Sequence, residues 1–363
     1  MAVTSNAVRI AVMPGDGIGV EVTEAATAVL GRLARRHGLG LHMETLEAGA
    51  FAYQKTGTAM SEAVFRQAEA SDAILLGAMG WPGIRYPDGT EIAPQLDLRF
   101  RLGLYAGLRP IRAIPGVPLA LADPRAQTID MVILRESTEG LFWARGRGEM
   151  VGDEEARDTM VITRATTERL SRFAFRLAER RTERLRRPQK VTLVDKANVF
   201  LSMAFMRRVF DEVAAEFPSV PSGHHYVDAM ALDLVRRPWD FDVLPMENMF
   251  GDIISDLGAG LIGGMGYAPS ADIGDTYAVF QPSHGTGPDI AGKGVANPTA
   301  MLLSAALMLD WLGTRGAGQA WSDAVTELEA AVDAAFADGL QTAEFGGVGT
   351  VAVAKAVAAQ IPG

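Results

Sequence analysis

The chain has 363 residues, of which 48% are hydrophobic and 21% charged, a composition typical of a globular protein long enough for two lobes. The absence of cysteine excludes disulfides, thiol catalysis and thiolate zinc sites, and the formal net charge of −10 opposes general nucleic-acid binding without excluding a small anionic substrate. No apolar run reaches the roughly 18 residues that span a bilayer, and the N-terminus lacks a basic patch followed by an apolar core, so we expect no membrane partner, no secretory signal and a cytoplasmic location.

Strands and helices alternate in the hydrophobic pattern. Strands are predicted at residues 8–13, 73–79, 131–135, 190–195 and 241–246. Helices are predicted from the turn after the first strand to about Arg36, and at 166–187, 198–217, 298–312 and 322–338. This alternation predicts an α/β architecture with a parallel sheet, in which functional residues gather at the carboxyl ends of strands.

The segment GDGIG, residues 15–19, follows the first strand and opens the first helix. Phosphate-binding turns are found at such places. Its spacing is not GxGxxG, however, and glycine turns after strands are common. A ligand loop and an ordinary turn therefore both stay open.

Arg99, Arg109 and Arg135 form the next group. Arg99 and Arg109 lie ten residues apart in DLRFRLGLYAGLRP, and Arg135 ends the strand predicted at 131–135. A guanidinium binds carboxylates with two parallel hydrogen bonds, so three convergent arginines would hold a dicarboxylate. Three separate surface salt bridges are the alternative.

Lys196, in VDKANVF, follows a predicted strand and precedes a predicted helix. A half-buried lysine in this position can have a lowered pKa and act as a base. The alternative is a lysine that only pairs with Asp195 or a helix end. Asp228, in HHYVDAMAL, lies at a strand-to-helix switch, either as a helix N-cap or as a metal ligand.

Acidic residues also occur within the otherwise hydrophobic stretch MENMFGDIISD, residues 246–256. On a helix, Asp252 and Asp256 lie one turn apart on the same side and repel each other. They are either a solvated face or two ligands of a hard divalent cation, which prefers carboxylate oxygens. Asp228 would supply a third carboxylate for the second reading.

The last segment, HGTGPDIAGKGVANP, spans residues 284–298. Its glycines and prolines predict a loop rather than a helix or strand. Its His, Asp and Asn side chains are of the kinds that hold a nucleotide, which makes it a candidate binding loop.

Together, LRFRLGLYAGLRP, VDKANV, ENMFGDIISDLGAGLIGG and HGTGPDIAGKGVANP resemble the isocitrate/3-isopropylmalate dehydrogenase family of metal-dependent β-decarboxylating dehydrogenases. The resemblance covers nearly the whole chain in the right order. It implies a two-lobed, non-Rossmann α/β fold, with residues 1–107 and 262–363 forming a cofactor-binding lobe and 108–261 a substrate and dimerisation lobe. It also implies a homodimer with shared active sites.

The resemblance implies that Asp252 and Asp256 of one subunit and Asp228 of the other hold Mg²⁺ or Mn²⁺, with K⁺ a candidate further ion. Lys196, also from the partner, is then the base, acting through water and Asp228. The metal would polarise the ketone and stabilise the enolate as CO₂ leaves.

NAD is the cofactor that the resemblance implies, bound by His284, Gly285, Asp289 and Asn297. Asp289 matches the position that contacts the adenosine ribose in NAD-using members. A carboxylate there accepts a hydrogen bond from the 2′-hydroxyl and repels the 2′-phosphate of NADP.

By the same resemblance, Arg99, Arg109 and Arg135 hold the carboxylates of a malate-like dicarboxylate. Two positions depart from the family pattern. RESTEGLF has Phe142 in place of the usual tyrosine that protonates the enolate, and the substrate-selecting position four before Arg99 is Gln95. The substrate stays open between 3-isopropylmalate, tartrate or D-malate, and isocitrate-like acids. Phe142 also leaves open a catalytically impaired regulatory paralogue.

Overall fold

The computed structural model describes residues 7–362, which form two compact units. The first comprises the described parts of Met1–Gly103, Ile114–Pro118 and Ile262–Gly363; the second comprises Leu104–Ala113 and Leu119–Leu261. The assignment of cofactor binding to one lobe and substrate binding to the other stays a prediction. The N-terminal stretch considered for a secretory signal begins outside the described residues.

The second unit is built on five strands in the order β4-β5-β10-β8-β9. These are β4 (Ala106–Arg112), β5 (Asp130–Glu136), β10 (Val243–Met246), β8 (Val191–Asp195) and β9 (Ser222–Tyr226). The last four run parallel, and β4 runs antiparallel to β5. The carboxyl ends of the four parallel strands therefore meet at one edge, where the polar residues that follow them gather.

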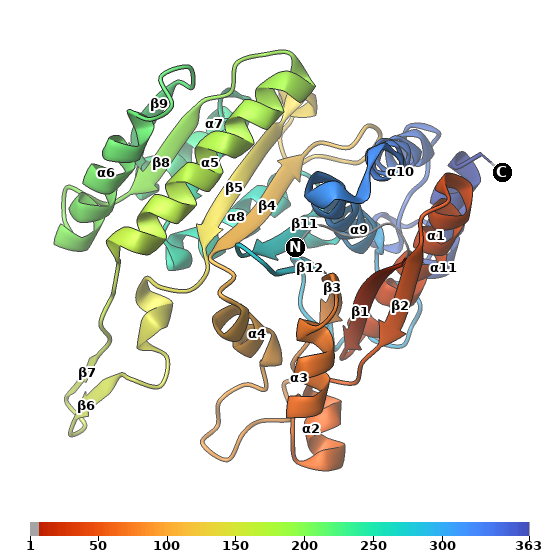
Figure 1. Ribbon diagram of the computed structural model, residues 1–363, viewed down its shortest axis with the longest axis horizontal. Coiled ribbons are helices and arrows are strands. Elements are labelled where there is room, and N and C mark those ends of the chain that lie inside the picture. Colours follow the sequence, from red (N-terminus) through yellow and green to blue (C-terminus); the bar gives the residue numbers. More distant parts are fainter. Residues whose placement is uncertain (1–6, 363) are drawn as a thin grey trace. The chain divides into compact units, whose positions relative to one another are not determined.

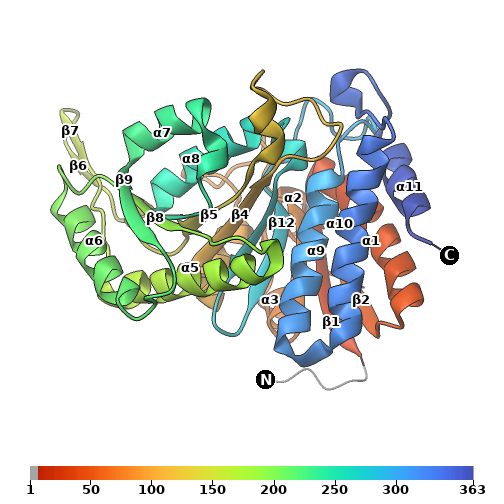
Figure 2. The same ribbon diagram turned by 90° about the horizontal axis from the view of Figure 1, so that it is seen from above.

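Helices cover both faces of this sheet (Figures 1 and 2). On one face, α5 (Arg164–Leu185) packs against α6 (Leu201–Ala214); on the other lie α7 (Val227–Arg236) and α8 (Asn248–Leu261). The short helix η2 (Leu141–Ala144) leads to a hairpin, β6 (Glu149–Val151) and β7 (Glu155–Arg157), which stands away from the rest of the unit. The predicted α/β class is confirmed, and β4, β9 and the hairpin are additions to the predicted elements.

The first unit has the strand order β2-β1-β3-β12-β11. These are β2 (Leu41–Thr45), β1 (Val8–Gly15), β3 (Ala73–Ala78), β12 (Ala278–Pro282) and β11 (Pro269–Ile273). The strands β2, β1, β3 and β12 are parallel, and β11 is antiparallel to β12. The predicted parallel sheet is therefore confirmed for most strands, with one antiparallel strand in each unit.

Four helices of the first unit pack together, namely α1 (Ile18–His37), α9 (Thr299–Leu312), α10 (Gln319–Ala337) and α11 (Thr350–Gln360). Nearly every residue of α9 is buried, as expected for a helix that is hydrophobic all round. The remaining helices are α2 (Ala50–Thr56), α3 (Glu62–Glu69) and α4 (Pro94–Leu102). Short helical turns are η1 (Pro124–Thr128), η3 (Pro238–Asp240), η4 (Met265–Tyr267), η5 (Gly313–Ala317) and η6 (Ala343–Phe345). Among the described residues, no helix is both long and apolar enough to cross a membrane.

Candidate active site

Asp252 and Asp256 of MENMFGDIISD lie on α8 beside two buried arginines. Asp252 forms an ion pair with Arg135, the last residue but one of β5. Burial and the neighbouring Asp252 raise the pKa of Asp256, while Arg109 and Arg135 oppose that rise. The solvated-face reading stays open for Asp252, whose side chain is 47% exposed, although the guanidinium that pairs with it is only 4% exposed. Two carboxylates and two guanidiniums thus gather on one side of α8.

Arg135 is held by more than its ion pair. Its Nε donates to Oδ1 of Asn248 at 2.8 Å, and its guanidinium carbon lies 4.9 Å from the centre of the Phe142 ring. The helix approaches the strand closely here, because a Cβ at Gly251 would lie 2.6 Å from Cβ of Arg135. The guanidinium is therefore fixed from three sides.

Arg99 lies in the first unit, on α4. Its Nε donates to Oδ2 of the buried Asp272 at 3.0 Å. The surface salt bridge reading is wrong for all three arginines, since Arg99, Arg109 and Arg135 are 7%, 5% and 4% exposed. Convergence of Arg99 with the other two stays a prediction.

Gln95, one turn before Arg99 on α4, has a buried amide oxygen. Within residues 7–362, this Oε1 has no hydrogen-bond partner. A buried carbonyl oxygen without a donor is costly, so it is a candidate contact for a ligand that brings one.

Lys196 follows β8 and is half-buried, as predicted. Its Nζ lies 2.5 Å from Oδ1 of Asp228, and it lowers the pKa of that carboxyl. The alternative pairing with Asp195 is wrong, because Asp195 is fully buried and accepts both hydrogen bonds of Arg207, at 2.6 and 2.8 Å. The N-cap reading of Asp228 is also wrong, since Tyr226 occupies that position of α7. The two predicted proton-transfer residues thus form a pair.

Residues 7–362 do not bring three candidate metal ligands together within one chain. In the described part of the chain, no three His, Cys, Asp or Glu side chains are grouped so that they could hold an ion. The pair Asp252 and Asp256 still suits a divalent cation, because both donors are hard oxygens. Burial and, after it, repulsion from Asp252 raise the pKa of Asp256, and a cation would relieve that repulsion. The contribution of Asp228 from a second subunit stays a prediction.

The loop at residues 284–298 joins β12 to α9, as predicted. Burial lowers the pKa of His284, and its Nε2 is buried without a partner among the described residues. Asp289 is exposed at the surface of the loop. Asn297 is held at both ends of its amide, by Glu344 at 2.9 Å and by the N–H of Thr299 at 3.0 Å. The loop therefore presents a neutral imidazole and a free carboxylate, which suit a nucleoside.

The GDGIG turn does not cradle a phosphate. The first N–H groups of α1 already have acceptors: Ile18 donates to the carbonyl of Thr286 at 2.9 Å, and Gly19 donates to that of Asp16 at 3.0 Å. Gly17 has φ 56°, and a Cβ there would lie 2.2 Å from the Thr286 oxygen. The turn instead connects the end of β1 to the loop at residues 284–298, through the hydrogen bond from Ile18 to Thr286.

Three buried or half-buried glutamates, to which the sequence assigned no role, surround the segment that carries Phe142. They are Glu136, Glu139 and Glu247. They line a small enclosed cavity together with Gly140 and the first turn of α5. The sequence RESTEGLF could have indicated these glutamates, because polar and acidic residues directly after a buried strand need hydrogen-bond partners inside the protein.

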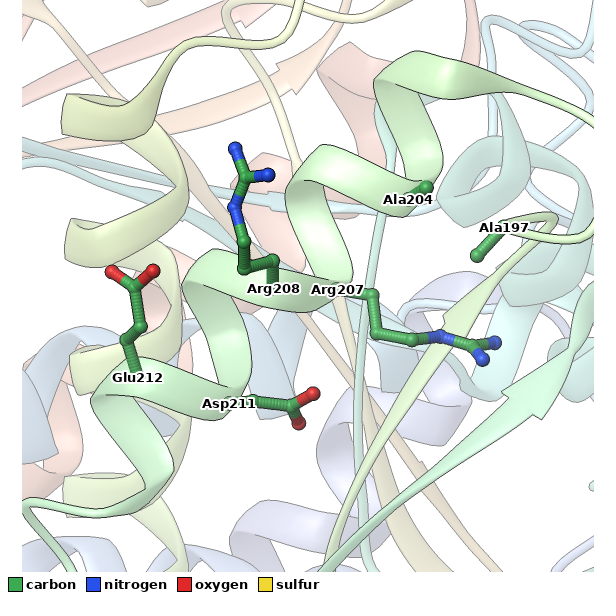
Figure 3. A pocket seen from close by; sticks show the side chains of 6 residues that line it. All are labelled: Ala197, Ala204, Arg207, Arg208, Asp211 and Glu212. Carbon is green, nitrogen blue, oxygen red and sulfur yellow. The ribbon is translucent and has the colours of Figure 1, made fainter.

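A hollow on the surface of α6 is lined by Ala197, Ala204, Arg207, Arg208, Asp211 and Glu212 (Figure 3). Three of its four charged side chains form ion pairs with residues outside the hollow, namely Arg207 with Asp195, Asp211 with His224 and Glu212 with Arg164. The fourth, Arg208, lies over the Phe205 ring. We assign no function to the hollow, because these side chains already have partners.

Glu136→Gln is expected to change how stability depends on pH. Burial raises the pKa of Glu136 from 4.5 to about 7. The folded chain thus binds this proton more tightly than the unfolded chain, so the carboxyl lowers stability as pH rises through that interval. The difference between the unfolding temperature of the variant and that of the parent should therefore shift in favour of the variant as pH rises from about 5 to about 8. Thermal unfolding followed by circular dichroism checks this, with Glu149→Gln on exposed β6 as control. A difference that does not change with pH would contradict it.

The chain is similar to characterised proteins along nearly its full length. The family model described as isocitrate/isopropylmalate dehydrogenase matches residues 9–361. The 3-isopropylmalate dehydrogenase of Methanothermobacter thermautotrophicus is 40% identical over 359 residues, covering 96% of this chain and 97% of that protein. Among solved structures, isocitrate dehydrogenase from Methylococcus capsulatus is 35% identical with a TM-score of 0.83, covering 98% of this chain and 99% of that one. The apo β-decarboxylating dehydrogenase from Thermococcus kodakarensis is 36% identical with a TM-score of 0.76, over 98% and 96%.

Proposed function

Because the chain belongs to the isocitrate/isopropylmalate dehydrogenase family, as its motifs predicted, we propose that it oxidatively decarboxylates a 3-substituted malate with NAD and a divalent metal. It is an oxidoreductase of the decarboxylating dehydrogenase type. The leading substrate is 3-isopropylmalate, the acid named in the relatives. The observation that carries the proposal is the gathering of Arg109, Arg135, Asp252 and Asp256 on one side of α8.

The arginines hold the substrate. Arg109 and Arg135 are buried and close to α8, so each offers a desolvated guanidinium to a carboxylate. Arg99 is proposed as the third. Its pairing with Asp272 uses Nε, and the far nitrogens of the guanidinium can take a second acceptor.

Lys196 takes the proton of the C2 hydroxyl as C2 is oxidised. Asp228, 2.5 Å away, stabilises the ammonium that results. Bound NAD⁺ would accept the hydride from C2, and Mg²⁺ or Mn²⁺ held by Asp252, Asp256 and Asp228 of the partner subunit would draw charge from the oxygen as CO₂ leaves. The proton path therefore begins at the C2 hydroxyl and leads to the Lys196–Asp228 pair.

Phe142 replaces the proton donor of the family pattern. A phenyl ring has no proton to give, so we assign protonation of the enolate carbon to a water held by Lys196. The ring instead packs on the Arg135 guanidinium. The alternative of an impaired regulatory paralogue would predict no turnover of any acid, but the base and metal positions are all filled.

We propose a homodimer because the second unit exposes a group of apolar side chains that a second subunit could cover. They are Val199, Phe200, Leu201, Leu232, Val235 and Ile253, and they lie near the start of α6 and on α7 and α8. Leu201 is 87% exposed and Ile253 is 60% exposed. Contact through these helices would bring Lys196 and Asp228 of one subunit near α8 of the other.

Asp289 is expected to make the enzyme prefer NAD to NADP by at least about tenfold in kcat/KM. Its exposed carboxylate accepts from a ribose 2′-hydroxyl and repels a 2′-phosphate. Initial rates with both cofactors measure the ratio, and Asp289→Asn should reduce it. Equal use of both cofactors by the parent would show that the loop has been misassigned.

A malate with a polar C3 group, as in tartrate or isocitrate, is the second candidate substrate. The unpartnered Oε1 of Gln95 favours a C3 hydroxyl, as in tartrate, because a hydroxyl can donate to this oxygen. Neither an isopropyl group nor the carboxylate of isocitrate can donate, and an unsatisfied buried acceptor costs about 1–3 kcal/mol. Rates of NADH formation on 3-isopropylmalate, tartrate, D-malate and isocitrate, with Mn²⁺ and K⁺ present, test both candidates. Gln95→Leu should shift preference toward 3-isopropylmalate. No NADH from any of them would contradict the proposed function.

A further inference from the structure

Glu247 joins two segments that meet at the candidate site. It lies between β10 and α8 and is 1% exposed. Its Oε1 accepts from the N–H of Leu141 at 2.8 Å, and its Oε2 accepts from those of Met249 at 3.0 Å and Phe250 at 3.2 Å. Gly140 makes room for the carboxylate, because a Cβ there would lie 2.0 Å from Oε1. One buried carboxylate therefore holds three backbone N–H groups from two different segments.

One segment carries Asp252, and the other carries a residue that packs on Arg135. Leu141 precedes Phe142, whose ring packs on the Arg135 guanidinium. Met249 and Phe250 open α8, and Asp252 follows within its first turns. Glu247 therefore holds the backbone behind Asp252 and behind the ring that contacts Arg135, and it is itself buried.

Asn248 extends the same connection. Its Oδ1 accepts from Nε of Arg135 at 2.8 Å, and its Nδ2 donates to the carbonyl of Glu139 at 3.0 Å. The direction of this side chain depends on the backbone that Glu247 holds. A carboxylate at the first N–H groups of a helix is also electrostatically favourable.

We propose that Glu247 is a positioning residue of the active site, which sets the placement of Arg135 relative to Asp252 and thereby both divalent-metal affinity and turnover. The proposal rests on the proposed function in one respect, the assignment of Asp252 as a metal ligand. It adds a residue that touches neither substrate, cofactor nor metal.

Glu247→Gln is the matched test variant. The amide keeps the shape of the side chain but has one acceptor oxygen, and its NH₂ group would face an N–H. Either Leu141 or the first turn of α8 then loses its acceptor. Glu139→Gln is the control, because the Glu139 carboxylate binds the same loop to α5 through Thr163 and Thr166 and does not touch α8.

The experiment compares Mn²⁺ binding by electron paramagnetic resonance, kcat and KM in the dimeric parent and both variants. Glu247→Gln should weaken Mn²⁺ binding and lower kcat, each by about 10- to 100-fold, as loss of a residue behind metal ligands typically does. The KM for NAD should not change. Hydrogen exchange at the Leu141 amide should become faster. Glu139→Gln should leave Mn²⁺ affinity near that of the parent, even where its unfolding temperature falls equally.

Parent-like Mn²⁺ affinity in Glu247→Gln, or an equal loss in both variants at equal stability, would overturn the proposal. If Glu247→Gln does not fold, Glu247→Asp replaces it as the test variant. The aspartate keeps the charge at the start of α8 but is too short to reach the N–H of Leu141. Faster Leu141 exchange with a lower kcat then supports the proposal, and faster exchange with parent kcat overturns it. Mn²⁺ binding to Asp252→Asn distinguishes failure of this proposal from failure of the proposed function. Unchanged Mn²⁺ affinity in that variant would reject Asp252 as a metal ligand.

Discussion

Lys196→Met is expected to lower kcat by about 10²–10⁴-fold, the usual loss when a positioned base is removed. Methionine keeps the length and apolar stem of this half-buried side chain, so packing is retained while the amine is lost. Asp228 loses its partner at 2.5 Å, but it is largely exposed and can be hydrated instead. Steady-state kcat with saturating substrate, cofactor and Mn²⁺ measures the effect.

The matched control is Lys190→Met, at an exposed lysine immediately before β8. Its kcat should equal that of the parent, and substrate binding should be similar in all three proteins. Recovery of more than about a tenth of parent kcat in Lys196→Met would remove Lys196 from the role of base.

Asp252→Asn is expected to abolish metal-dependent turnover, a loss on the order of 10²–10³-fold or more. The substitution removes a charged ligand from a site that acts by Lewis acidity, and it also takes the counter-charge from Arg135. The residual rate should be the same with excess Mn²⁺ and with excess chelator. Asp211→Asn, at a surface ion pair with His224, is the control and should keep the metal dependence of the parent. A variant that still responds to Mn²⁺ as the parent does would contradict the assignment of Asp252.

The two variants together test whether active sites are shared. In a hybrid dimer of Lys196→Met and Asp252→Asn subunits, one shared site would contain both native residues and the other neither. Mixing the inactive proteins under exchange conditions should therefore restore up to about a quarter of parent activity. Sites formed within single chains would give no recovery, since each subunit carries one lesion.

Much of the second unit could be predicted because its strands are strongly apolar and end in polar residues. The strands at 131–135, 190–195 and 241–246 all form, and the parallel arrangement places Arg135, Lys196 and the acids of α8 along one edge. Strand β9, with the sequence SGHHY, is short and polar, and β4 contains a proline and two arginines. Neither has the apolar pattern on which the prediction relied.

The contacts that define the site could not be predicted, because they join residues far apart in the chain. The stretch MENMFGDIISD has no basic residue, yet Asp252 is paired with an arginine 117 positions away. Glu247 likewise satisfies Leu141, 106 positions away, and spacing alone gives no sign of it. Arg181 lies in the arginine-rich stretch of residues 178–190, a composition that favours an exposed helix end, yet it is buried and donates to Asp130 and Gln189. Sequence patterns indicate which face of an element is buried, and only the fold decides which distant group meets it there.

Oxidative decarboxylation at a metal-dependent site is tested by following NADH and CO₂ together on the best acid of the panel. NADH is followed by absorbance and CO₂ by isotope release from a substrate labelled in the β-carboxylate, with Mn²⁺ and with excess chelator. The two products should form in equal amounts with Mn²⁺, and both should cease with chelator. NADH formation without CO₂, or equal rates of both products in chelator, would contradict it.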